Sequence, residues 1–187
     1  MKKKPVIFID RDGVINFDSP DYIKSCEELF FIPGSIEAIA NLSKLGYEIF
    51  TITNQSVIGR KMVTMDGLRQ IFDKMLDSVK ENQGEIKEIF FCPHIPSDNC
   101  QCRKPKPGLF FQAKDKYNLD LSNSVMIGDS SKDIIAAENA NIKFKILVLT
   151  GNGKKSQKEL EEKQIIPDYI ADNLFDAHNW IIKNTGS

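Results

Sequence analysis

The sequence of 187 residues has no long hydrophobic run, no excess of either charge and no linker of low complexity. The apolar stretch near its start, Val6–Ile9, ends at Asp10, whereas a membrane span needs about 20 apolar residues and a secretory signal about 7–15. The 25 basic and 26 acidic residues give a net charge of −1, without the positive excess of a general nucleic-acid binder. We therefore expect one globular domain over residues 1–187, cytoplasmic and monomeric, with no membrane or nucleic-acid partner and with the lysines at positions 2–4 in solvent.

Cysteine is also scarce, and its placement favours a metal site over disulfide bonds. Four cysteines are too few for a disulfide-rich scaffold of this length. Three of them, Cys92, Cys100 and Cys102, lie within eleven positions that also contain His94, one of two histidines. Three thiolates and one imidazole form the ligand set of a tetrahedral structural zinc site, so we predict Zn²⁺ in this loop. A disulfide with one free thiol, or buried cysteines beside a surface histidine, is the alternative interpretation.

Hydrophobic patterning predicts strands and helices that alternate along the chain. Apolar and β-branched runs predict strands at 5–9, 47–53, 89–91, 125–127 and 146–149, with a weak one at 169–170. Helical periodicity and capping residues predict helices at 35–45, from the N-cap Thr64 to 79, from 108, at 133–139 and at 174–181. This alternation indicates an α/β fold with a doubly wound parallel sheet, whose ligand crevice lies at the carboxyl ends of the strands.

Polar residues follow three of the predicted strands at the point where each strand ends. They are Asp10 and Asp12 after the first strand, Thr53 and Asn54 after the second, and Asp129 and Asp133 after the strand at 125–127. Because the carboxyl ends of parallel strands meet at one edge of a sheet, we expect these side chains to converge. Converging carboxylates repel one another unless a cation is bound, and Mg²⁺ is the hard cation that such ligands suit.

These residue types fit a phosphoryl-transfer reaction. A carboxylate such as Asp10 can attack phosphorus, and a second carboxylate such as Asp12 can protonate the leaving oxygen and then activate water. Lys104 offers a compact positive charge for Asp10 and the phosphate, while Thr53 and Asn54 offer a hydroxyl and an amide. The residues therefore predict a Mg²⁺-dependent phosphoryl-transfer site.

From residue 6 to about 151, the motifs resemble those of the haloacid dehalogenase superfamily of phosphatases. The resemblance lies in Asp-x-Asp-Gly at 10–13 after a hydrophobic strand, in Thr53 and Lys104, and in Gly-Asp-x-x-x-Asp at 128–133. It implies that Asp10 is the nucleophile and a Mg²⁺ ligand. It implies that Asp12 is the general acid and base and binds the metal through its backbone carbonyl. Asp129 would be the third protein ligand and Asp133 a supporting acid, while Thr53, Asn54 and Lys104 would bind the transferred phosphoryl group.

The chain departs from the superfamily pattern in two places. Ser130 and Ser131 stand where a lysine often follows the metal-binding aspartate, and whether Lys132 substitutes for that lysine stays open. The segments 16–32 and 55–63 are too short to hold the cap domain of the superfamily. We therefore expect an open site without a large cap.

The cysteine-rich loop resembles that of two groups within the superfamily, the D,D-heptose 1,7-bisphosphate phosphatases and the histidinol-phosphate phosphatases. Thr-Asn-Gln-Ser at 53–56, followed by Arg60, is more similar to the heptose group. That resemblance implies removal of the C7 phosphate from a phosphorylated heptose in bacterial lipopolysaccharide or surface-glycan synthesis, with Arg60 and Arg103 on the distal phosphate or the sugar. Because Cys102 precedes Arg103 and Lys104, zinc in the loop would also determine where Lys104 points.

Three alternative functions remain open from the sequence. A histidinol-phosphate phosphatase shares the zinc loop. A polynucleotide 3′-phosphatase shares Asp-x-Asp-Gly and Thr-Asn-Gln, although the net charge of −1 disfavours it. A zinc-stabilised binding module without catalysis would leave Asp10 and Asp12 without a role.

Overall fold

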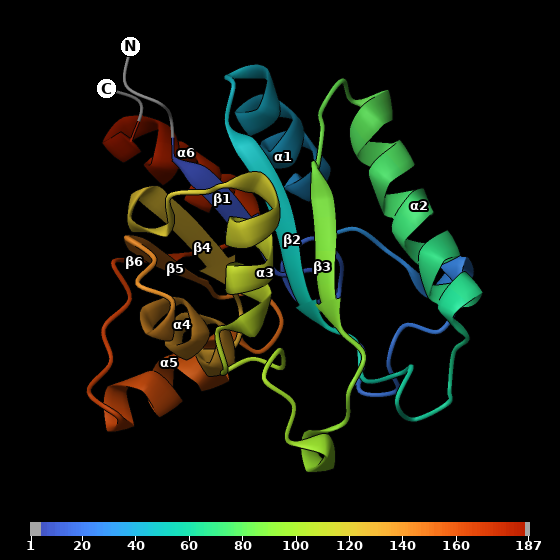
Figure 1. The fold of residues 1–187 in the computed structure, drawn as a ribbon. Coiled ribbons are helices and arrows are strands. Elements are labelled where there is room, and N and C mark those ends of the chain that lie inside the picture. The colour runs from blue at the N-terminus through green and yellow to red at the C-terminus, as the bar shows by residue number, and fades with distance from the viewer. Residues whose placement is uncertain (1–4, 186–187) are drawn as a thin grey trace.

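The protein folds around a six-stranded parallel sheet with helices on both faces (Figure 1). The structure is a computed structural model that describes residues 5–185, so the lysines at 2–4 lie outside the described residues. The strands are β1 (Val6–Ile9), β2 (Glu48–Asn54), β3 (Glu88–Cys92), β4 (Ser124–Gly128), β5 (Phe144–Val148) and β6 (Tyr169–Ala171). The helices are α1 (Ser35–Lys44), α2 (Met65–Glu81), α3 (Gly108–Tyr117), α4 (Ser131–Asn139), α5 (Gly153–Glu162) and α6 (Leu174–Thr185). The predicted doubly wound α/β fold is confirmed.

The strand order places β1 at the centre of the sheet, next to the point where the chain reverses direction across it. The order is β3-β2-β1-β4-β5-β6, so the chain moves outward from β1 through β2 and β3 and then returns to β4 on the other side of β1. Ile9, the last residue of β1, is in register with Thr51 on β2 and Ile127 on β4. Ligands bind at such a reversal in doubly wound sheets, outside the carboxyl ends of the strands.

Side chains from the two faces of the sheet build two main hydrophobic layers. Ile7 and Ile9 pack on one face with α1, α2 and α6, whereas Val6 and Phe8 pack on the other with α3 and α4. Alternate residues of a strand point to opposite faces, and all four side chains of β1 are buried. The buried central strand therefore fixes the position of Asp10, which follows it directly.

Most predicted elements appear within a few residues of their expected bounds, and helix α5 is the main omission. Thr64 caps α2 as predicted, its Oγ1 accepting the Gly67 N–H at 3.1 Å. Helix α4 begins at Ser131 rather than 133, because the Ser130 Oγ accepts the Lys132 N–H at 3.3 Å. Helix α5 buries only Gly153, Ser156 and Leu160, so its sequence lacks the apolar periodicity that predicts a helix.

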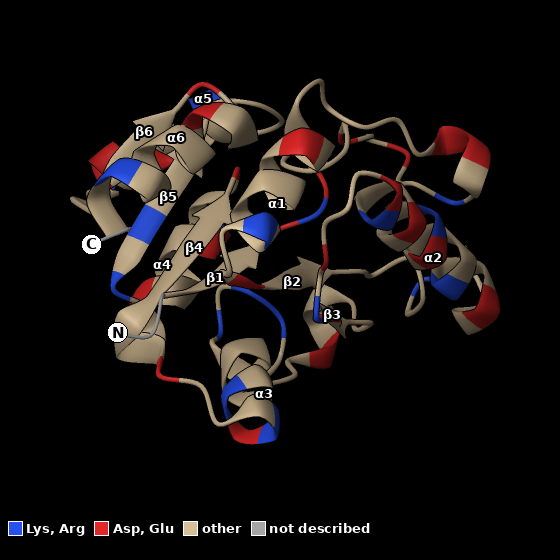
Figure 2. Ribbon diagram, turned by 90° about the horizontal axis from the view of Figure 1, so that it is seen from above, with Lys and Arg blue, Asp and Glu red and all other residues tan. Residues whose placement is uncertain are grey.

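The charged residues are spread over the outer faces of the helices and over the loops. Figure 2 shows acidic and basic residues interspersed along α2, in keeping with the near-neutral net charge. Among the described residues, no helix is both long and apolar enough to cross a membrane.

Candidate active site

Asp10 lies directly after β1, where two donors hold one oxygen of its carboxylate. Its backbone N–H donates to the Ile127 carbonyl at 2.9 Å, which continues the pairing of β1 with β4. Its Oδ1 accepts the Arg11 backbone N–H at 2.8 Å and lies 3.0 Å from Lys104 Nζ. No described residue donates a hydrogen bond to Oδ2, so this oxygen is available for chemistry.

Lys104 is buried beneath the site and connects two acidic residues. Its side chain is 2% exposed, and Nζ lies 2.6 Å from Asp133 Oδ1 and donates to the Ile52 carbonyl at 2.7 Å. Burial lowers the pKa of Lys104, but its ion pairs with Asp10 and Asp133 outweigh that effect and leave the pKa raised. Asn54 fixes the Lys104 backbone with two hydrogen bonds, at 3.1 and 3.2 Å. Lys104 therefore places a positive charge at a fixed position beside the Asp10 carboxylate.

Three carboxylates meet at the edge of the sheet. One oxygen from each of Asp10, Asp129 and Asp133 lies within 4.8 Å of the others. Burial raises the pKa of Asp10 to about 7, against the lowering effect of Lys104. Burial and the neighbouring Asp133 and Asp10 carboxylates raise the pKa of Asp129 to about 8. A single lysine does not neutralise this cluster, so the donor set suits a divalent cation with oxygen ligands, as Mg²⁺ requires.

Backbone packing at a glycine and the side chain of an asparagine hold Asp129 in place. Its Oδ2 accepts the Asn152 backbone N–H at 2.7 Å and the Asn152 side-chain amide at 3.2 Å. Gly13, with a φ of 79°, lies against the Asp129 carboxylate, where any side chain would clash. The glycine of Asp-x-Asp-Gly thus serves both the tight turn and the close approach of Asp129.

Asp12 stands apart from the three-carboxylate cluster. Its carboxylate accepts hydrogen bonds from the side chains of Arg11, Asn16 and Gln55. Burial raises the pKa of Asp12, but the Arg11 guanidinium and these hydrogen bonds outweigh it and lower the pKa. The predicted metal ligand set therefore includes Asp12 only through its backbone, as the family resemblance implies, while Asp133 completes the carboxylate cluster.

The residues predicted for catalysis, for magnesium and for the phosphate groups line one cavity of about 190 Å³, with a single exception. The lining comprises Asp10, Asp12, Thr53, Asn54, Arg103, Lys104, Asp129 and Asp133 from the predicted set. Arg60 is the exception, because it is not part of this lining and its guanidinium lies 5.6 Å from the centroid of the Tyr22 ring. Tyr22 itself lines the cavity, as does Lys132.

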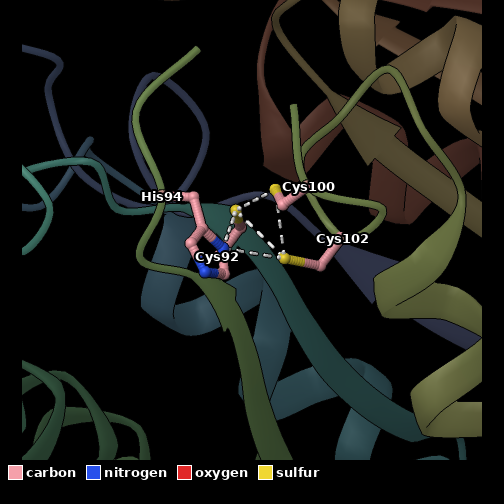
Figure 3. A group of neighbouring side chains, drawn as sticks. All are labelled: Cys92, His94, Cys100 and Cys102. Carbon is pink, nitrogen blue, oxygen red and sulfur yellow. Dashed lines mark hydrogen bonds between the residues drawn. The ribbon is translucent and has the colours of Figure 1, made fainter. Parts of the chain in front are cut away.

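The predicted zinc ligands gather beside the site, at the end of β3 and in the loop that follows (Figure 3). The Sγ atoms of Cys92, Cys100 and Cys102 lie 3.2–3.5 Å apart. Nδ1 of His94 lies 3.3 Å from Cys102 Sγ and 3.6 Å from Cys92 Sγ. Ligands at 2.3 Å around a tetrahedral ion stand about 3.8 Å apart, so the four atoms fit Zn²⁺ with little movement. All three cysteines are free thiols, which does not support the disulfide alternative.

The zinc loop joins directly onto the active site. Arg103 follows Cys102 and donates from Nη1 to the His94 carbonyl at 3.1 Å. Lys104 comes next in the chain, two residues after the zinc-ligand candidate Cys102. That zinc in the loop fixes where Lys104 points stays a prediction.

Several residues that contact the predicted catalytic groups cannot be recognised from the sequence. Arg11, Asn16 and Gln55 bind Asp12, and Asn152 binds Asp129. In the sequence Arg11 is only the residue between two aspartates. The one available signal was the proximity of Gln55 to Thr53, since residues two apart on an extended chain face the same side.

Comparisons with known proteins show the family of this chain. A family model described as HAD-hydrolase-like matches residues 101–177. The chain is 39% identical, over 182 residues and 97% of each chain, to a D-glycero-beta-D-manno-heptose-1,7-bisphosphate 7-phosphatase of Neisseria meningitidis. It belongs to the haloacid dehalogenase-like phosphatases. A phosphatase of the same name from Pseudomonas aeruginosa is 43% identical over 169 residues, 90% of this chain and 94% of that one.

A solved structure from this phosphatase family resembles the fold over almost its full length. The D,D-heptose 1,7-bisphosphate phosphatase of B. bronchiseptica superposes with a TM-score of 0.91 and 34% identity. The match covers 97% of this chain and 99% of that one, and that structure contains magnesium and phosphate. The family resemblance predicted from the motifs is confirmed.

Proposed function

We propose that this phosphatase removes the C7 phosphate from D-glycero-β-D-manno-heptose 1,7-bisphosphate and leaves the 1-phosphate, with Mg²⁺ as cofactor and with Zn²⁺ in a structural role. The observation that carries the proposal is the near-full-length similarity to phosphatases named for this substrate. The cluster of Asp10, Asp129, Asp133 and Lys104 in one cavity supports it chemically. The β anomer is chosen because the curated relatives carry it in their names. We further propose that the enzyme acts in the cytoplasm as a monomer.

The first step is nucleophilic attack by Asp10. Oδ1 is engaged by Lys104 and the Arg11 N–H, so Oδ2 attacks the C7 phosphorus. A bond forms between Oδ2 and phosphorus, and the bond between phosphorus and the sugar oxygen breaks. Asp12, which is ionised in the free site because its pKa is lowered, relays a proton from solvent to that oxygen, and the phosphoryl group is then held on Asp10.

The second step returns the enzyme to its starting state. Asp12, now ionised, accepts a proton from a water molecule, whose oxygen attacks phosphorus and displaces the Asp10 carboxylate. The products are inorganic phosphate and the heptose 1-phosphate. The proton that Asp12 takes from this water returns to solvent, so protons balance over the two steps.

The transferred group carries negative charge that the site must neutralise. We assign Thr53, Asn54 and Lys104 to the phosphoryl oxygens, and Asp133 to fixing Lys104 through their 2.6 Å contact. Mg²⁺, held by Asp10, Asp129 and the backbone carbonyl of Asp12, supplies charge neutralisation between the nucleophile and the phosphate.

The second phosphate of the substrate requires cations at the outer part of the cavity. Arg103 and Lys132 both line it and fit the C1 phosphate. Arg60 lies over the Tyr22 ring, so we assign it to positioning this cavity wall as well as to the sugar end of the substrate.

A phosphate-release panel tests the proposal. Purified protein with Mg²⁺ is compared on both anomers of the heptose bisphosphate, histidinol phosphate, fructose bisphosphate and a 3′-phosphorylated oligonucleotide. We expect the highest kcat/KM on the β-heptose bisphosphate and loss of phosphate release of about 10³-fold or more in Asp10→Asn, which removes the nucleophile. A higher kcat/KM on histidinol phosphate would replace the assigned substrate, and full activity of Asp10→Asn would falsify the assigned nucleophile.

A further inference from the structure

We propose that Arg11 and Gln55 are positioning residues that hold the Asp12 carboxylate in its proton-transfer geometry. The inference rests on the proposed function, in which Asp12 exchanges a proton with the leaving oxygen and with water. Its basis is the number and direction of the donors that surround this one carboxylate.

Arg11 donates hydrogen bonds to the Asp12 carboxylate from two of its nitrogens. Its Nε donates to Oδ1 at 3.0 Å, and Nη2 lies 2.7 Å from Oδ1 and 2.8 Å from Oδ2. Such a planar, two-pronged contact fixes the plane of a carboxylate as well as its position, which a single charge does not. Arg11 is therefore suited to orient Asp12.

Burial of Arg11 makes this contact its main polar interaction. The residue is 1% exposed, and its Nη1 has no hydrogen-bond partner among the described residues. The guanidinium carbon lies 5.7 Å from the centroid of the Phe72 ring on α2. A buried arginine with an unpaired nitrogen is costly to the fold, which favours a role at Asp12 over a purely stabilising one.

Gln55 links Asp12 to the proposed phosphate site. Its Nε2 donates to Asp12 Oδ2 at 2.8 Å and to Thr53 Oγ1 at 3.0 Å, and its side chain is buried. Its backbone N–H donates to the Cys92 carbonyl at 2.7 Å, which ties it to the end of β3. One amide therefore sets the position of Asp12 relative to Thr53.

The donor count also assigns the oxygen that exchanges the proton. Oδ1 accepts from Arg11 Nε, Arg11 Nη2 and Asn16 Nδ2, whereas Oδ2 accepts from Arg11 Nη2 and Gln55 Nε2. A carboxylate oxygen offers about two lone-pair sites, so Oδ1 with three donors is the more crowded oxygen, whereas Oδ2 shares the Nη2 donor with Oδ1 and has only Gln55 Nε2 to itself. Proton transfer therefore runs through Oδ2, beside Gln55.

The test uses two substrates that differ in how much their leaving group needs a proton. Phosphate release is measured for Arg11→Met and Gln55→Met on the β-heptose bisphosphate, whose sugar alkoxide leaves poorly, and on 4-nitrophenyl phosphate, whose phenolate leaves without protonation. The ratio kcat/KM reports steps up to departure of the leaving group, so the later hydrolysis step does not interfere. We expect kcat/KM to fall about 10²-fold on the sugar phosphate and by less than about 3-fold on the aryl phosphate.

Three further variants serve as controls for the comparison of the two substrates. Asp12→Asn should show the same split between substrates. Arg11→Lys keeps the charge but not the two-pronged contact, so it should recover only part of the lost activity. Arg69→Met removes an exposed arginine of α2 that pairs with Asp66 at 3.0 Å, and it should leave both substrates unchanged.

Each outcome has a defined meaning. Equal losses on both substrates in Arg11→Met and Gln55→Met, or full recovery in Arg11→Lys, overturn the positioning role. If Arg11→Met does not fold, Gln55→Met decides by the same criterion. Absence of the split in Asp12→Asn shows instead that the proposed function has the wrong acid, which separates the two failures.

Discussion

Replacing Lys104 with methionine should destabilise the protein strongly, and by an amount that depends on pH. Lys104 is 2% exposed and lies 3.0 Å from Asp10 Oδ1 and 2.6 Å from Asp133 Oδ1. Methionine has a similar length but leaves two carboxylates without their cation, and it leaves the Ile52 carbonyl without its donor. Breaking a buried ion pair by removing one partner costs about 3–5 kcal/mol of the free energy of unfolding.

The pH dependence follows from the pKa of Asp10. Burial raises this pKa to about 7 even with Lys104 present. At pH 5 Asp10 is therefore protonated with or without Lys104, and Lys104→Met leaves only the Asp133 carboxylate without its cation, whereas at pH 8 Asp10 loses its cation as well. We expect a loss of about 3–5 kcal/mol at pH 8 and about half of that at pH 5.

Urea denaturation of the magnesium-free protein at both pH values provides the measurement. Lys116→Met is the matched control, because Lys116 also lies 2.6 Å from a carboxylate, that of Glu88, but is 58% exposed. An exposed pair is screened by water, so this variant should show little change at either pH. A Lys104→Met loss below about 1 kcal/mol, or an equal loss at pH 5 and pH 8, would refute the account of Lys104 as the cation of a buried acidic cluster.

Two further predictions concern the metals. Cys102→Ser should lose the one zinc ion per chain that elemental analysis of the parent protein detects, because it removes a zinc ligand. The loop that carries Lys104 then loses its cross-link, so Tm should fall and phosphate release should decrease even with Mg²⁺ in excess. Unchanged activity without zinc would contradict this prediction. In magnesium-free buffer the free energy of unfolding should fall on the order of a few kcal/mol between about pH 4 and pH 8, because the raised pKa values of Asp10 and Asp129 make the folded state bind more protons than the unfolded state. The lowered pKa of Asp12 works in the opposite direction only below about pH 4. Added Mg²⁺ should cancel the fall, and a stability that rises over this range would show that the carboxylates are not destabilised by burial.

The strands and the acids that end them were predictable because two strong local signals coincide there. An apolar run that ends in charge, as at Val6–Ile9 and Asp10, marks both a buried strand and its exit from the sheet. The same pattern before Asp129 then places the two acids together, because parallel strands share one carboxyl edge. Helix α5 has no comparable signal, since its three buried positions include a glycine and a serine.

The arrangement within the site was less predictable, because it depends on contacts between residues far apart in sequence. Lys104 was expected beside Asp10, but its contact with Asp133 and its link to Asn54 depend on how the zinc loop returns to β2. Arg60 was expected at the substrate, and its position over Tyr22 depends on a loop whose course the sequence does not determine.

Arg11 shows why a motif can conceal a functional residue. Along an extended strand, residues 10 and 12 would face one side and residue 11 the other, so Arg11 would point away from both acids. The strand ends at Ile9, however, and the chain turns, with the Ile15 N–H donating to the Arg11 carbonyl at 2.8 Å. The turn brings the Arg11 guanidinium back onto Asp12 while Asp10 stays aligned with β1. Two acids two residues apart therefore receive opposite environments, a raised pKa for Asp10 and a lowered one for Asp12, because the residue between them lies at a turn and not in a strand.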